Sequence, residues 1–133
     1  MAALLAGACW LVLATPVWAN VKFYTIVQQI CRSYRVPVDQ AQMTLNYPAG
    51  GTTFDLALRS RRNNYQEVLL VGYIASSQAI ARTGVEVQTI SVTVSVPGAD
   101  NMVLMTTADA EMLGDLRLGK IKSSQFLRQI EWN

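Results

Sequence analysis

Few residues in this chain could do chemistry, and the clearest sign is an absence. The 133 residues include no histidine, so the commonest general base and the commonest transition-metal ligand are missing. Catalytic arrangements that pair serine or cysteine with histidine are excluded with it. The two cysteines are Cys9, inside an apolar N-terminal run, and Cys31. The sequence therefore favours a non-catalytic protein without a metal or another cofactor.

The densest positive charge is a short loop that contains Arg59, Arg61 and Arg62. It stands just before a predicted helix, where free backbone amides and the helix dipole favour anions. This loop could bind a phosphate, a lipid headgroup or an acidic patch of a partner protein. The alternative is a solvated loop whose charge keeps the end of a hairpin soluble.

The acidic residues and the methionines have structural explanations. Asp109 and Glu111 lack the spacing of a calcium loop, and Asp109 is expected to cap a helix. Met102 and Met105 are three apart on a predicted strand, so they point to opposite faces and cannot chelate one ion. We expect both methionines to fill the core.

Cys31 lies on the apolar face of a predicted helix over 20–35. The simpler interpretation is a buried thiol that acts as a small hydrophobic group. The alternative is an intermolecular disulfide, because an exported domain that has lost Cys9 offers Cys31 no partner within the chain.

The N-terminal residues predict export. An almost unbroken apolar run over 2–13 precedes Pro16, and Ala19 stands just before Asn20. This pattern is typical of a signal peptide, and the run is shorter than the about 20 residues that a membrane span needs. We expect cleavage after residue 19 and a periplasmic or extracellular domain over 20–133. Because the usual positive charges are missing before the run, an uncleaved anchor is the alternative.

Apolar spacing predicts the helices that must position these groups. Apolar residues recur every three or four positions over 20–35 and 65–82, which predicts two helices, the second one buried. Asn64 and Glu67 predict a capping box at the start of the second helix, and Gly84 predicts its end. A stripe of small residues would let this helix lie close against a sheet: Gly72, Ala75, Ser76 and Ala79.

Between the helices the period changes to two, which is typical of strands. The alternation predicts two hairpins, over 40–47 with 53–59 and over 90–96 with 102–107, turning at 48–51 and 97–101. A slip in phase before Ile90 suggests a bulge. A helix over about 109–117 and a last amphipathic helix from Ser124 toward Trp132 follow.

The resulting order is helix, hairpin, helix, hairpin, helix. It predicts a single α+β domain of two layers, a mainly antiparallel four-stranded sheet with helices on one face. Half the residues are apolar and 15% are charged, which indicates a folded core. A net charge of +2 is too small for a dedicated nucleic-acid binder.

The polar face of the predicted sheet is almost uncharged. It consists of Gln40, Gln42, Thr44, Asn46, Ser91, Thr93 and Ser95. Solvated strands usually carry lysine and other charges that oppose stray pairing. A neutral face can bind a partner without the cost of burying charge. The alternative is the ordinary wet face of a half-buried sheet.

These observations predict a small exported binding or assembly module. It would act through its polar sheet face, an edge strand or the Arg59–Arg62 loop, on a protein partner or a second copy of itself. One alternative is a small-ligand carrier, with a pocket between helices and sheet lined by Phe54, Tyr73 and Met105. Another is a membrane-tethered accessory subunit, if residues 1–19 are not cleaved.

Overall fold

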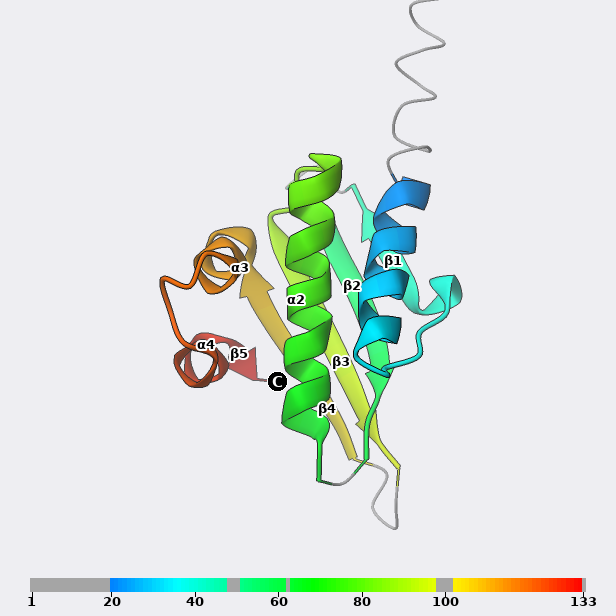
Figure 1. Ribbon diagram of the computed structural model, residues 1–133, viewed down its shortest axis with the longest axis vertical. Coiled ribbons are helices and arrows are strands. Elements are labelled where there is room, and N and C mark those ends of the chain that lie inside the picture. Colours follow the sequence, from blue (N-terminus) through cyan, green and yellow to red (C-terminus); the bar gives the residue numbers. More distant parts are fainter. Residues whose placement is uncertain (1–19, 48–50, 62, 98–101, 133) are drawn as a thin grey trace, which may run out of the picture.

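The structure is a computed structural model that describes residues 20–47, 51–61, 63–97 and 102–132 (Figure 1). A helix over residues 20–33, here the N-terminal helix, comes first. The other elements are η1 (Gln40–Gln42), β1 (Met43–Asn46), β2 (Thr53–Arg59), α2 (Tyr65–Thr83), β3 (Thr89–Val96), β4 (Met102–Asp109), α3 (Ala110–Arg117), α4 (Ser123–Gln129) and β5 (Glu131–Trp132). The predicted α+β class is confirmed.

The sheet has five strands in the order β1-β2-β3-β4-β5, one strand more than predicted. Three of its pairs are antiparallel, but the central pair of β2 and β3 is parallel. The parallel pair arises because α2 carries the chain back along the sheet between the two hairpins, as a crossover helix does. The sheet is therefore mixed.

The helices cover one face of the sheet. Figure 1 shows α2 lying along the middle of the sheet, with the N-terminal helix beside it and α3 and α4 on its other side. The strands bury alternate residues toward this layer, such as Phe54, Leu56 and Leu58 of β2. On the N-terminal helix, Phe23 packs edge-on against Phe54 with ring centroids 4.7 Å apart. The core therefore lies between the two layers.

The small-residue stripe of α2 is buried against the strands, as the sequence predicts. At Gly72, an added Cβ would lie 2.9 Å from Leu58 Cδ1 and 3.1 Å from Val92 Cγ1. Because real Cβ atoms essentially never come so close, the missing side chain sets the distance between helix and sheet.

The predicted end of α2 is confirmed, but the predicted capping box at its start is not. Gly84 ends the helix in the left-handed region at φ 73°, as expected, and its N–H donates to Ile80 O. The predicted capping box at the start is wrong. The Asn64 side chain turns back and accepts the Arg61 backbone N–H at 2.7 Å, so it does not cap the helix. Glu67 is exposed in the first turn.

The N-terminal helix ends at residue 33, two residues earlier than predicted. Arg35 adopts the left-handed region at φ 63°. The Val36 N–H donates to Cys31 O at 2.8 Å and the Arg35 N–H to Arg32 O at 2.9 Å, which is a Schellman motif. Tyr34, whose spacing would place it on the apolar face of a helix that continued to residue 35, lies beyond the helix end and is 55% exposed.

Three local predictions for the strands and the last helix are corrected. Residues 40–42 form a short 3-10 helix, in which the Asp39 N–H donates to Gln42 Oε1 at 3.0 Å, so β1 begins only at Met43. β3 pairs without interruption from Thr89, so the slip in phase lies in the loop before the strand. Trp132 belongs to β5, because α4 ends at Gln129.

Several sequence predictions fall on residues outside the described ranges. These are the signal peptide or anchor over 1–19, the turn residues 48–50 and 98–101, and Arg62. Within the described ranges, no helix combines the length and the apolar character that a membrane crossing requires.

Candidate functional site

The strand register brings most of the predicted polar face together on the side of the sheet away from the helices. Thr44 pairs with Asp55, which pairs with Ser91, and the next rows hold Thr93 and Ser95. Paired residues of neighbouring strands point to the same face, so these side chains form one surface, here called the open face. Gln40 lies in the 3-10 helix and is not part of the open face. Gln42 reaches its margin, where Nε2 donates to Ala57 O at 2.9 Å.

The open face is less polar than the sequence predicts. Register places Met105 opposite Thr93 and Val103 opposite Ser95, which puts both on the open face. Met105 is 52% exposed and Val103 is 53% exposed. Met102, on the other face, is 44% exposed, so the expectation that both methionines fill the core is wrong. The consecutive apolar residues 102–105 gave no period to assign them to a face. Pairing with the clearly alternating β3 was the missing information.

The charged residues of the open face are few. Asp55 accepts a hydrogen bond from Asn46 Nδ2 at 2.8 Å, and Arg59 occupies the row of Ser95 and Val103. A shallow depression of about 250 Å³ lies near Gln42, Thr44 and Thr93. The surface thus combines hydroxyl and amide groups with an exposed apolar pair, Val103 and Met105, on β4.

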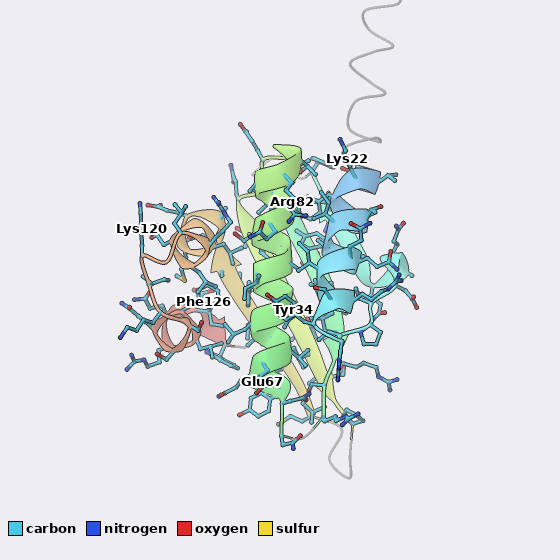
Figure 2. The ribbon with its side chains drawn as sticks, viewed as in Figure 1. Lys22, Tyr34, Glu67, Arg82, Lys120 and Phe126 are labelled. Atoms are coloured by element: carbon cyan, nitrogen blue, oxygen red, sulfur yellow. The ribbon has the colours of Figure 1, made fainter. Side chains whose placement is uncertain are left out.

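The arginine loop borders a second site, a groove of about 900 Å³ at one end of the domain. Four segments line it: the end of the N-terminal helix with the residues after it, the end of β2 with its following loop, the first turns of α2, and Pro97 after β3. In Figure 2, Tyr34 and Glu67 mark the first and the third of these segments. We call this site the end groove.

Positive charge predominates in the end groove. Its lining includes Arg35, Arg59 and Arg61 against a single acidic residue, Glu67. Arg35 is remote in sequence from the predicted loop and was not singled out, because only the tertiary fold brings it there. Arg62, also predicted for this site, lies outside the described residues.

Ser60 also lines the end groove and is 7% exposed. The burial alternation of β2 places its side chain on the helix side, in sequence with Leu58. Its Oγ is buried and has no hydrogen-bond partner among the described residues. Most buried hydroxyls in proteins are paired, so this one is unusual. In the sequence, Ser60 stands between Arg59 and Arg61 and shows no sign of being buried.

Cys31 is fully buried in the core. Burial raises the pKa of its thiol to about 11, because the thiolate is poorly solvated there. Its environment matches the packing interpretation. An intermolecular disulfide would require the N-terminal helix to leave the sheet.

The lining predicted for a carrier pocket does not come together. Phe54 and Tyr73 are fully buried and packed against other aromatic rings, Phe23 and Phe126 respectively. Met105 lies on the opposite side of the sheet. The end groove is the larger of the two hollows, and neither is a pocket lined by these three residues.

The acidic residues near β4 take the structural role that was predicted. Asp109 caps α3, and its Oδ1 accepts the Met112 N–H at 2.7 Å. Register also confirms that Met102 and Met105 belong to opposite faces, since their partners are Val96 and Thr93. No group of three or more metal-ligating His, Cys, Asp or Glu side chains occurs among the described residues.

Comparison with known proteins finds no relative: no family model, no curated protein and no solved structure matches this chain.

Proposed function

We propose that this protein is a non-catalytic binding or assembly module that contacts a protein partner through the open face of its sheet. The observation that carries the proposal is the exposed apolar pair Val103 and Met105 among hydroxyl-bearing neighbours. The helices cover one face of the sheet, so the open face is the side that they leave uncovered (Figure 1).

The chemistry of the open face supports a protein partner. Contact would remove the Val103 and Met105 side chains from water, and Thr93 and Ser95 beside them can exchange hydrogen bonds with the partner. Little charge would need to be desolvated beside this pair, because Thr93 and Ser95, its direct partners on β3, are uncharged. Asp55 and Arg59, both on β2, would orient the partner through their opposite charges.

The proposed place of action is outside the cytoplasm, either free or held at the membrane. It rests on the apolar run over 2–13 followed by Pro16 and Ala19. Intact-mass measurement of the chain from its native envelope fraction tests it. A chain that begins at Asn20 supports a free exported module, and an uncleaved membrane-bound chain supports a tethered subunit. An uncleaved chain in the cytoplasmic fraction would contradict export.

A photo-crosslinking amino acid at position 105 tests the binding surface in the native cell. We expect one discrete adduct, identified by mass spectrometry as a single protein or as a second copy of this chain. The matched control places the same group at Arg82, which is exposed on α2 on the helical side (Figure 2).

The proposal also requires that Val103→Glu prevents this adduct, because a carboxylate at this contact position would have to be desolvated. Equal labelling from positions 105 and 82, or an adduct that survives Val103→Glu, would contradict an open-face interface.

A further inference from the structure

We propose that the end groove is a binding site for a phosphate group carried on an apolar body, separate from the open-face contact. The groove brings Arg35 and Arg61 together from two distant segments of the chain, and Arg59 borders it at the end of β2 with its side chain on the open face. Guanidinium groups recognise phosphate oxygens through paired hydrogen bonds, which makes arginine well suited to such a site.

The second observation is the buried hydroxyl of Ser60. Its Oγ has no hydrogen-bond partner among the described residues, although the residue is only 7% exposed. A phosphate oxygen in the groove would accept the Ser60 O–H, which would remove the cost of an unpaired buried donor. The two observations are independent, since one concerns charge and the other an unmet hydrogen bond.

The start of α2 adds donors to the same place. The first amide with an intrahelical partner is Val68, which donates to Asn64 O at 3.0 Å. The Asn64 side chain is occupied by the Arg61 N–H and does not cap the turn before it. The amides of residues 65–67 therefore have no side-chain cap and lie at the positive end of a 19-residue helix.

The groove also has an apolar part, and its volume of about 900 Å³ is far larger than a phosphate ion needs. Val36, Pro37, Leu70 and Val71 form this part of the lining. A ligand that fills it would join a phosphate group to a hydrocarbon or similar body. Both a soluble organic phosphate and a phospholipid headgroup with its glycerol have this chemistry.

Titration of the full chain with hexyl phosphate, inorganic phosphate and hexanol tests the site. We expect hexyl phosphate to bind roughly tenfold or more tightly than inorganic phosphate, since two buried methylenes suffice for that factor. Hexanol at the same concentrations should not bind measurably. Failure of hexyl phosphate to bind would overturn the proposal.

Charge variants give a pattern of opposite signs that a nonspecific effect would not produce. Arg61→Gln and Arg35→Gln should each weaken hexyl phosphate binding roughly tenfold or more, and Ser60→Ala should weaken it several-fold, about as an unmade hydrogen bond does. Glu67→Gln should strengthen binding, because it removes the one negative charge of the lining. Arg82→Gln, a charge change outside the groove lining, is the matched control. Circular dichroism verifies that each variant folds.

Vesicles distinguish the two sources of the phosphate. Recruitment of the full chain to phosphatidylcholine vesicles that contain phosphatidic acid, beyond phosphatidylcholine alone and lost in Arg61→Gln, would assign a lipid headgroup. Hexyl phosphate binding without this extra recruitment would assign a soluble ligand. Affinities that stay unchanged in both Arg61→Gln and Glu67→Gln would overturn the site, whereas the adduct from position 105 tests the open face alone.

Discussion

Two buried side chains that can lose a proton, the thiol of Cys31 and the phenol of Tyr73, make the stability of the domain depend on pH. Tyr73 is fully buried, and its hydroxyl lies 2.8 Å from Thr106 Oγ1. The Thr106 hydroxyl donates its one proton to Val92 O at 2.9 Å, so the Tyr73 O–H is the donor in the first bond. Burial raises the pKa of Tyr73 to about 12, as it raises the pKa of Cys31 to about 11.

Stability should therefore fall in alkaline solution. The folded pKa of Cys31 lies above its ordinary value of 9.0, so the folded state retains a proton that the unfolded state has released. The stabilisation that comes from this retained proton is fully present below about pH 9. It is lost as the pH rises through about 11, and the loss in unfolding free energy is at most about 3 kcal/mol. Tyr73 adds a further loss between its ordinary 10.0 and about 12.

Urea unfolding at a series of alkaline pH values measures this loss. In Cys31→Ala the slope of the unfolding free energy between about pH 9 and 10 should become flatter, since no thiol remains to titrate. A slope that is the same in Cys31→Ala would show that the thiol is solvated in the folded chain.

Arg35 is the other single residue with a direct prediction. It is the one non-glycine residue with positive φ among the described residues. Arg35→Gly should stabilise the domain by about 0.5 to 1 kcal/mol, because glycine adopts this conformation without a steric cost. The matched control Arg32→Gly, three residues earlier and within the helix, should destabilise it by about 1 kcal/mol. Thermal unfolding distinguishes these opposite signs.

The same substitution links stability to the end groove. If Arg35 is retained at a glycine-favouring position for its charge, Arg35→Gly should also weaken hexyl phosphate binding. A variant that is more stable and binds as tightly as the original chain would separate the backbone conformation from ligand binding.

At the scale of elements, α2 determines how the two hairpins meet. It spans from the end of β2 to the start of β3 and makes these strands parallel neighbours. Its small residues let the helix axis approach the strands, and Gly72 is the point of closest approach among the described glycines of the helices. The position of α2 therefore affects both layers.

Two glycine-to-alanine changes should have opposite effects. Gly72→Ala adds a methyl group within 2.9 Å of Leu58, and we expect a loss of about 1 to 3 kcal/mol from overpacking despite the better helix propensity. Gly114→Ala in α3 meets no heavy atom within 4 Å, and we expect a gain of up to about 1 kcal/mol. Chemical denaturation measures both. A gain at Gly72 would mean that α2 lies farther from the sheet.

At the scale of the whole molecule, the two faces of the sheet should tolerate change very differently. Leu56 is 2% exposed under the helices, and Leu56→Ala should cost about 2 to 5 kcal/mol. Met105 is 52% exposed on the open face, and Met105→Ala should cost no more than about 0.5 kcal/mol in the isolated chain. A large loss for Met105→Ala in a sample shown to be monomeric would mean that another part of the chain covers the open face.

Several features could be predicted from the sequence because neighbours along the chain determine them. The central helix, its end at Gly84 and the Asp109 cap follow from local periodicity and local hydrogen bonds. The alternation of β2 and β3 identified the buried and open sides of the sheet's centre. These elements needed no knowledge of what packs against them.

The remaining features depend on contacts between distant residues, so only the tertiary structure decided them. The parallel pairing of β2 with β3 requires α2 to lie across the sheet, and the assignment of Met105 to the open face requires the register with β3. The end groove unites Arg35 with Arg61 only after the helices pack. The order of residue types along the chain determined its helices and strands and their apolar sides. Packing decided which strands pair and which charged residues share a site.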